Sequence, residues 1–321
     1  MEILNAFDVA AIEQAASVLA SGGVVAFPTE TVYGLGADAF NARAVARIFE
    51  IKRRPRFDPL IVHVAKKEWV FDIAEHVPLQ AIRMMDRFWP GPLTIILKKQ
   101  PCVPDIVTAG LSTVGVRMPS HPAALALIEA LGRPIAAPSA NPFGYISPTR
   151  ARHVAKMFRD EPGIILDGGN SRFGIESTIV SIHDGMIILH RHGAVPVEEL
   201  NSIGETVREK TAGNVCEAPG ELPYHYAPMK PLKIIDHLDE ITVSASSYLG
   251  FKEAEKQPPS RYVKYLSRDG DMREAASNFF SHLIELDRQD IDVIYAERIP
   301  ERGLGKAMME RLMKAAKKCT A

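Results

Sequence analysis

Short apolar runs alternate with longer amphipathic stretches over the first two thirds of the chain. Asp8 can cap a helix whose apolar residues recur on one face until Gly22 ends it, and Asn41 can cap a second helix that ends before Pro55. Helical spacing returns at 122–131 and at about 149–158, and residues 28–38 are predicted to be a loop. The apolar runs predict strands at 24–27, 60–64, 93–97, 114–118, 163–166, 177–182 and 186–190.

Strands mixed with helices at this spacing predict an α/β sheet domain, which we place at residues 1–208. Its last two strands are joined by a short turn and should form an antiparallel hairpin. Residues 209–231 contain four prolines and no apolar periodicity, which predicts a semi-extended linker.

The remaining segment, 232–321, has the pattern of a small Rossmann-like α/β domain. Residues 237–260 are weakly patterned, and no element is predicted there. Strands are predicted at 232–235, 261–267 and 292–297, and helices at 271–287 and 303–318.

Composition changes this picture little. The chain has 321 residues, 46% of them hydrophobic, and its length suits two domains. A net charge of -1 argues against broad non-specific binding of nucleic acid, so an anionic ligand must be met by local charge. Cys102, Cys216 and Cys319 are far apart and odd in number, which favours plain thiols in a reducing compartment. Because no apolar run reaches the roughly 18 residues of a membrane span, we expect a cytoplasmic protein with no membrane contact.

Positive charge gathers between residues 41 and 60. Six basic residues face only two acids there. Cations near the end of a helix complement its macrodipole, which accounts for one or two of them. A phosphate site would account for more, because lysine supplies a point charge and arginine a bidentate fork. From the residues alone, both interpretations stay open.

Other polar residues interrupt or directly follow the predicted strands. Arg117 breaks an apolar run with no acid nearby in sequence, so a ligand carboxylate is a reasonable partner. Ser177 and Arg191 interrupt strands in the same way, whereas His63 would more often be a satisfied core histidine. No metal-ligand spacing or P-loop occurs, and "RGLGK" at 302–306 fits a turn as well as a phosphate site.

Together these segments resemble the YrdC-like family of threonylcarbamoyl-AMP synthases. The family's Lys-x-Arg and Ser-x-Asn signatures match Lys52-Arg53-Arg54 and Ser139-Ala140-Asn141, with "PTETVYGLG" upstream, "FWPGPLT" and "VGVRMP" between them. The resemblance covers residues 10–200, and "PYHYAP" with a C-terminal segment ending "GLGKAMMERLMKAA" is similar to the longer, two-domain (Sua-type) branch. It implies a YrdC-like twisted mixed sheet with a concave basic cleft, followed by the small Rossmann-like domain.

The resemblance also implies a nucleotidyltransferase that joins L-threonine, bicarbonate and ATP into threonylcarbamoyl-adenylate and releases pyrophosphate. The product would pass to a tRNA threonylcarbamoyl transferase complex, which modifies the adenosine beside the anticodon. Mg²⁺ is expected with ATP, no protein nucleophile is expected, and tRNA itself would contact the protein weakly.

Roles for individual residues follow from the same resemblance. Lys52 and Arg54 would stabilise charge during catalysis, and Arg117 would face the threonine carboxylate. The family usually has a neutral polar residue where this chain has Asp58, and His225 or Tyr226 would fold over the nucleotide from the linker. The implied threonine site is Thr31, His63, Arg117, Ser139 and Ser177, and the implied ATP site is Arg54, Asp58, Thr113, Ala137, Ser139, Asn141, Ser147, Arg191, His225 and Tyr226.

Two other functions compete with this one. The basic face could be a non-catalytic module that binds tRNA or double-stranded RNA by shape. Carbamoyl transfer, as in related domains of hydrogenase maturation proteins, is disfavoured because no acylphosphatase-like or zinc-finger segment accompanies the domain.

Overall fold

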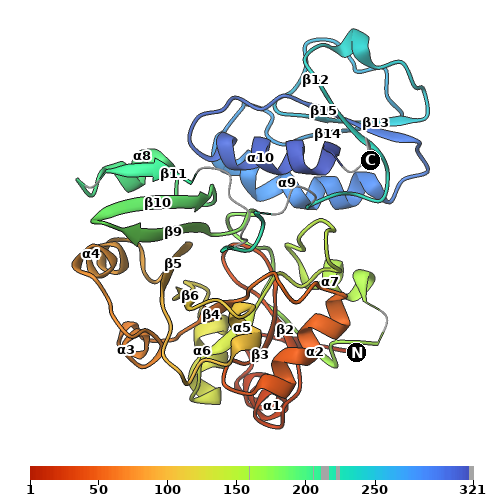
Figure 1. Ribbon diagram of the computed structural model, residues 1–321. Coiled ribbons are helices and arrows are strands. Elements are labelled where there is room, and N and C mark those ends of the chain that lie inside the picture. The colour runs from red at the N-terminus through yellow and green to blue at the C-terminus, as the bar shows by residue number, and fades with distance from the viewer. Residues whose placement is uncertain (159, 205, 211–216, 222–224, 318–321) are drawn as a thin grey trace.

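The chain forms a mixed α/β fold with two sheets, as the sequence predicts (Figure 1). The computed structural model describes residues 1–158, 160–204, 206–210, 217–221 and 225–317. Cys216, Cys319 and linker residue Pro223 lie outside the described residues. The one described cysteine, Cys102, is exposed and free.

The large sheet has eleven strands in the order β1-β8-β2-β3-β7-β4-β6-β5-β9-β10-β11. It contains both parallel and antiparallel pairs, and the predicted hairpin is the antiparallel pair β9–β10. The strands are β1 (Glu2–Asn5), β2 (Val25–Phe27), β3 (Gly34–Asp38), β4 (Ile61–His63), β5 (Leu93–Lys98), β6 (Thr113–Arg117), β7 (Ile135–Ala137), β8 (Ile164–Asp167), β9 (Thr178–His183), β10 (Met186–Arg191) and β11 (Val207–Glu209).

Helices cover this sheet and begin where the sequence places their caps. The Asp8 side chain accepts a hydrogen bond from Ala10 N, and Asn41 accepts from Arg43 N and Ala44 N. The helices are α1 (Val9–Ala20), α2 (Ala42–Lys52), α3 (Val70–Ile73), α4 (Leu79–Phe88), α5 (Asp105–Thr108), α6 (Pro122–Leu131), α7 (Ala151–Met157) and α8 (Val197–Asn201), with a 3-10 turn at Lys67–Trp69.

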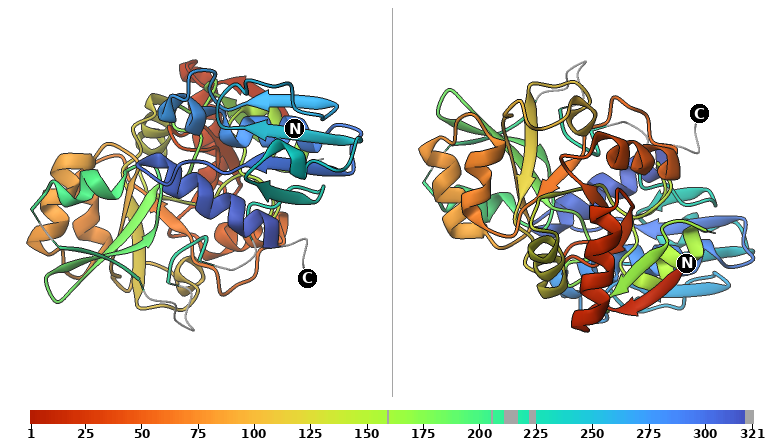
Figure 2. Two further views of the ribbon diagram at one scale, coloured as in Figure 1. Left: turned by 90° about the horizontal axis from the view of Figure 1, so that it is seen from above. Right: turned by 90° about the horizontal axis from the view of Figure 1, so that it is seen from below.

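The second sheet is parallel throughout, in the order β12-β15-β13-β14. Its helices α9 (Met272–Asp287) and α10 (Leu304–Lys317) lie between this sheet and the first domain (Figures 1 and 2). The strands are β12 (Leu232–Ile235), β13 (Ser246–Gly250), β14 (Tyr262–Tyr265) and β15 (Val293–Glu297), with a 3-10 turn at Leu238–Glu240.

One apolar core crosses the boundary between the domains. Phe279 and Phe280 of α9 belong to the same buried cluster as Val32, Ile175 and the linker residue Tyr226. Burial of aromatic side chains at such a contact is strongly favourable, so the two domains pack as one unit.

The loop prediction for residues 28–38 is wrong in its second half, because β3 lies there. Its sequence, "GLGAD", has no β-branched residue and no alternation. The glycines are required by packing: a Cβ at Gly36 would lie 2.7 Å from a ring carbon of Phe27. Strands β1, β11 and β13 were not predicted either, and β13 falls in the weakly patterned segment.

Candidate active site

Residues from several strands, two loops and the linker meet around one cavity. The accessible space inside it is about 50 Å³. Ten of the residues implied by the family resemblance line it: Thr31, Arg54, His63, Arg117, Ala137, Ser139, Ser177, Arg191, His225 and Tyr226.

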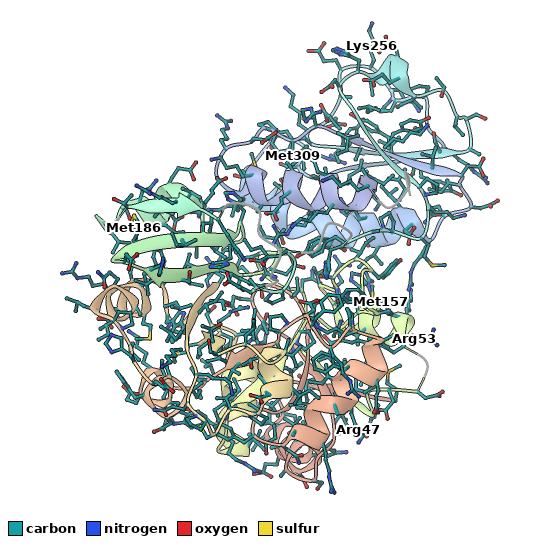
Figure 3. The ribbon with its side chains drawn as sticks, in the orientation of Figure 1. Arg47, Arg53, Met157, Met186, Lys256 and Met309 are labelled. Carbon is teal, nitrogen blue, oxygen red and sulfur yellow. The ribbon has the colours of Figure 1, made fainter. Side chains whose placement is uncertain are left out.

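The end of α2 places two basic side chains on different sides of the chain. Arg53 adopts a left-handed conformation (φ 52°) that ends the helix, and its side chain lies at the surface (Figure 3). Lys52 points inward, where its Nζ donates to Ser139 O at 2.6 Å and to Asn141 O. Burial, then the neighbouring Arg54, hold the pKa of Lys52 well below its usual value, against the attraction of Asp58. Lys52 therefore fastens the 139–141 loop to α2 from behind the cavity wall.

Arg54 lines the cavity and is held there by Asp58. Its NH2 lies 2.8 Å from Asp58 Oδ1, while its Nε and NH2 donate to the carbonyls of Asp58 and Pro59 at 3.0 and 2.9 Å. Burial raises the pKa of Asp58, and the charges of Arg54, Lys52 and Arg191 oppose that shift. Asp58 is fully buried beside Arg54 and does not line the cavity, so its implied contact with ATP stays a prediction.

Arg117 has an acidic partner that the sequence analysis missed. Its NH2 lies 2.5 Å from Glu30 Oε1, and its NH1 donates to Thr31 Oγ1 at 2.9 Å. No acid lies near Arg117 in sequence, because the two residues are 87 positions apart and meet only in the fold. The contact of Arg117 with a ligand carboxylate stays a prediction. The second oxygen of Glu30 is buried and has no hydrogen-bond partner within the described residues.

His63 lies beside this pair, since it is in register with Arg117 on the neighbouring strand. Burial, then the Arg117 charge, lowers the pKa of His63 to about 3. The imidazole is therefore neutral at physiological pH, and its Nδ1 has no hydrogen-bond partner in the described part of the chain. Ser177, also on the cavity wall, shares a hydrogen bond of 2.8 Å with Thr94.

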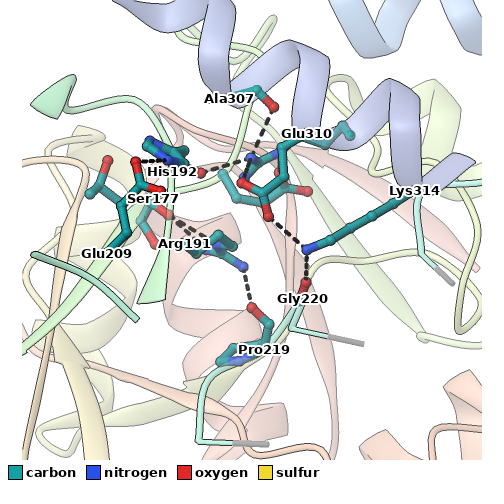
Figure 4. A network of polar contacts seen from close by, with 12 residues as sticks. Ser177, Arg191, His192, Glu209, Pro219, Gly220, Ala307, Glu310 and Lys314 are labelled. Atoms are coloured by element: carbon teal, nitrogen blue, oxygen red, sulfur yellow. Dashed lines mark hydrogen bonds and ion pairs between the residues drawn. The ribbon is translucent and has the colours of Figure 1, made fainter. Parts of the chain in front are cut away.

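Arg191 joins the strands to the linker (Figure 4). Its Nε and NH2 donate to Ser177 O at 3.1 and 2.9 Å, and its NH1 donates to Pro219 O at 2.9 Å. Lys314 of α10 donates to the next linker carbonyl, Gly220 O, at 2.5 Å and pairs with Glu310. Two cations from different domains thus hold adjacent carbonyls of the linker.

Both candidate linker residues, His225 and Tyr226, line the cavity, and their contact with the nucleotide stays a prediction. Tyr226 adopts a positive φ of 64° and stacks on Phe280 of α9, with ring centroids 5.8 Å apart. Burial, then Glu176, raises the pKa of Tyr226 to about 12. Burial, then Arg54, Lys52 and Arg191, holds the pKa of His225 well below its usual value.

The second domain also contributes a buried cation that the sequence analysis did not select. Arg311 of α10 is 1% exposed, and its Nε lies 3.0 Å from Oε2 of Glu176, a residue of the cavity wall. The other oxygen of Glu176 accepts from Ser147 Oγ at 2.5 Å. Glu176 could have been found beside Ser177 in "GIESTIV", but Arg311 looks like any polar residue of an amphipathic helix.

Five of the implied residues do not line this cavity. Lys52, Asp58, Asn141 and Ser147 lie behind its wall, where Asn141 Nδ2 donates to the carbonyls of its own loop. Thr113 lines a second cavity, farther along the same sheet. Their roles in binding stay predictions.

The described residues contain no group of three or more metal-ligating side chains, and none of their helices is long and apolar enough to cross a membrane. The "RGLGK" segment is a turn into α10, and its Gly303 N faces Glu198 Oε1 at 3.4 Å. A carboxylate therefore lies where a bound phosphate would have to lie.

A cavity walled by buried cations at strand ends, and closed by a linker to a second α/β domain, is the site of an enzyme for small anionic substrates. A model of the Sua5, YciO and YrdC proteins, described as "Telomere recombination", matches residues 17–193. A second model, described as "Threonylcarbamoyl-AMP synthase, C-terminal domain", matches residues 195–317. The chain belongs to the Sua5/YciO/YrdC family, in its two-domain form, which confirms the resemblance seen in the sequence.

Relatives match over nearly the whole chain. Threonylcarbamoyl-AMP synthases from Pyrococcus abyssi and Bacillus subtilis are each 43% identical; the alignments cover 95% of this chain and 94% and 92% of theirs. A crystal structure of P. abyssi Sua5 complexed with L-threonine superposes with a TM-score of 0.92, covering 99% of this chain and 98% of that one at 39% identity. The chain is accordingly an enzyme of the threonylcarbamoyl-AMP synthase type, which excludes the non-catalytic alternative.

Proposed function

We propose that the cavity binds L-threonine, bicarbonate and ATP and forms threonylcarbamoyl-adenylate with release of pyrophosphate. The observation that supports this best is the set of buried cations around one small space: Arg54, Arg117 and Arg191 on its wall and Lys52 behind it. Every one of these substrates is an anion or contains a carboxylate. Buried cations are costly unless they are paired, so their accumulation here fits a site that is built for anions.

The threonine end is the Arg117–Glu30 pair with Thr31, His63, Ser139 and Ser177. Arg117 receives the carboxylate, and the unpaired oxygen of Glu30 accepts a hydrogen bond from the amino group. Neutral His63 offers a donor or an acceptor to the threonine hydroxyl without adding charge. These contacts select a hydroxylated amino acid and direct its nitrogen toward bicarbonate.

The nucleotide end is Arg54 and Arg191, with Ser139 and the linker residues His225 and Tyr226. Arg54 and Arg191 face the triphosphate, and Lys52 adds charge from behind while it positions the 139–141 loop. Ala137, Asn141, Ser147, Asp58 and Thr113 complete or support this end.

The reaction needs no protein nucleophile. The threonine nitrogen attacks the carbon of bicarbonate, and loss of a proton from nitrogen and of hydroxide from carbon, together as water, gives a carbamate. A carbamate oxygen then attacks the α-phosphorus, the bond from that phosphorus to the oxygen bridging to the β-phosphate breaks, and pyrophosphate leaves. The protein positions the reactants and stabilises the negative charge on the oxygens around the reacting phosphorus, as is usual for displacement at phosphorus. Glu30 and Glu176 are already paired with arginines, so the Mg²⁺ that accompanies ATP is held mainly by phosphate oxygens and water.

The linker must move for this cycle to run. Ligand pockets are usually about 300–1,000 Å³, far larger than the space enclosed here. Pro219, Gly220, His225 and Tyr226 line this small cavity from the linker, so they withdraw for ATP to enter. The product then leaves for the tRNA threonylcarbamoyl transferase complex in the cytoplasm, and exposed Arg53 and Arg56 supply a weak contact with tRNA.

Release of pyrophosphate from ATP tests this function. It should require both L-threonine and bicarbonate. Arg54→Ala should lower the rate at least 100-fold, because it removes a buried charge that faces the phosphates, an effect of roughly the size of losing one preorganised donor. Arg43→Ala is the matched control, since Arg43 is an exposed arginine of the neighbouring helix α2. Normal turnover in the Arg54 variant, or pyrophosphate release without threonine, would contradict the proposal.

A further inference from the structure

A second hydrogen-bonded group of polar side chains lies outside the cavity described above. Ser181 Oγ is 2.8 Å from His190 Nε2, and His190 Nδ1 is 3.0 Å from Glu221 Oε1. A hydroxyl within reach of a histidine that is itself oriented by a carboxylate is the arrangement that activates a serine nucleophile. We propose that Ser181, His190 and Glu221 form a second catalytic site, which hydrolyses small neutral carboxylic esters.

The backbone directs His190 at Ser181. Leu189 pairs with Val180 and Arg191 pairs with Ile179, so His190 is the extra residue of a bulge in β10. Bulges of this kind re-aim a side chain and are frequent beside active sites. Ile188 pairs with Ser181, and His190 follows two residues later, so the bulge adjusts the direction of an imidazole that already lies near the Ser181 hydroxyl.

The carboxylate fixes the tautomer that a general base needs. Although burial raises the pKa of Glu221, hydrogen bonds from His190 and Lys210 outweigh that effect and hold the pKa below its usual value. An ionised carboxylate only accepts hydrogen bonds, so His190 Nδ1 carries the proton in this contact. In the neutral imidazole Nε2 then has a free lone pair, and it accepts the Ser181 hydroxyl proton.

Ser181 and His190 open onto a cavity of about 580 Å³, within the usual size of a ligand pocket. Ser181 is in register with Ile96 on β5 and Ile188 on β10, and both isoleucines line this cavity. The lysines of the wall are already paired, Lys98 with Glu75 at 2.6 Å and Lys210 with Glu221 at 2.9 Å. Apolar neighbours and compensated charges fit an uncharged ester with a short acyl chain.

This site is separate from the first. Ser177 of the first cavity and Ser181 of the second lie on the same face of one strand segment, about 13 Å apart at the usual rise of a strand. Ile61 lines the first cavity and Ile96 the second, and they pack together with Ile179 and Ala218 in an apolar cluster. The proposed ester site therefore has its own serine and base, and its pocket shares only Thr113 with the residues assigned to the nucleotide end.

The chemistry needs only water as co-reactant. Ser181 Oγ attacks the ester carbonyl carbon while its proton passes to His190 Nε2. The bond from the carbonyl carbon to the alcohol oxygen breaks, and the alcohol leaves with that proton. Water then attacks the acyl carbon as His190 takes its proton, the bond to Ser181 Oγ breaks, and the carboxylic acid and the free serine are released.

The test uses the full chain with p-nitrophenyl acetate as substrate and a biotinylated fluorophosphonate as a covalent probe. Ser181→Ala should lose the probe at this position and lower the esterase rate by at least about 100-fold. Ser112→Ala is the matched control, because Ser112 is another serine of the same cavity wall. The Ser112 variant should keep the fluorophosphonate label on Ser181 and the wild-type rate of ester hydrolysis.

Glu221→Gln distinguishes a positioning role from a merely structural one. It should lower kcat for the ester by about 10-fold or more while KM stays the same, since it removes the charge that orients His190. Threonine-dependent pyrophosphate release by the Ser181 variant reports that it is folded. If wild-type Ser181 is not labelled, or if Ser181→Ala hydrolyses the ester as fast as the wild type, the three residues only tether the linker and the proposal is overturned.

Discussion

Arg117 and Arg191, at opposite ends of the first cavity, are held in different ways. Arg117, at the threonine end, is fixed by a carboxylate and a hydroxyl of its own domain, Glu30 and Thr31. Arg191, at the nucleotide end, donates to the carbonyl and hydroxyl of Ser177 and to the carbonyl of Pro219 in the linker. The threonine end is therefore complete within the first domain, whereas the nucleotide end is completed only when the linker is docked.

Among the described residues, polar side chains of the second domain reach the linker and the cavity wall beside it. Its Arg311 neutralises Glu176 and lies over the Tyr226 ring, 5.3 Å from the centroid, and its Lys314 holds Gly220. These contacts of the second domain hold the linker against the cavity. The account predicts that changes at the two ends have separable effects.

The largest effect is expected at the threonine end. Arg117→Met would leave the Glu30 carboxylate buried without its cation, which should lower the free energy of unfolding by about 3–5 kcal/mol and abolish threonine binding. Urea denaturation measures the first effect and calorimetry the second. Adding Glu30→Gln should restore most of the stability and none of the binding. If the single variant is as stable as the wild type, the Arg117–Glu30 pair does not have the role assigned to it.

A smaller effect is expected from the second domain. Arg311→Met leaves Glu176 with only Ser147 as partner and should cost about 2 kcal/mol of stability. It should also lower kcat, because Tyr226 loses the cation above its ring, yet leave the affinity for threonine unchanged. Lys306→Met, on the same helix, is the control. If both variants lose the same amount of stability and kcat, the effect comes from the helix and not from the Arg311 contact.

Local signals in the sequence predicted much of the fold. The caps at Asp8 and Asn41 mark their helices because capping depends on adjacent residues. The β9–β10 hairpin was predictable from two apolar runs and a short turn. Strand β3 was not predictable. Its glycines are required because the Phe27 ring packs on them from a neighbouring strand.

The site was predictable only as far as its residues share motifs. The motifs selected Arg54, Ser139 and Arg191, which line one cavity, but not Glu30 or Arg311, whose partners are distant in sequence. The resemblance assigns Thr113 to the ATP site, but no motif indicates that this residue lines the second cavity. Pairing between distant charges depends on the sheet order and the domain contact, which no single segment contains.

Calorimetric titration of L-threonine without ATP, combined with the KM for ATP, tests the central claim most directly. Lys314→Ala removes a charged hydrogen bond to the linker, so the KM for ATP should rise about tenfold while the Kd for threonine stays within about twofold. Lys306→Ala should change neither quantity. If the Kd for threonine rises as much as the KM for ATP, the threonine end is not preformed, and the distinction between the two ends is wrong.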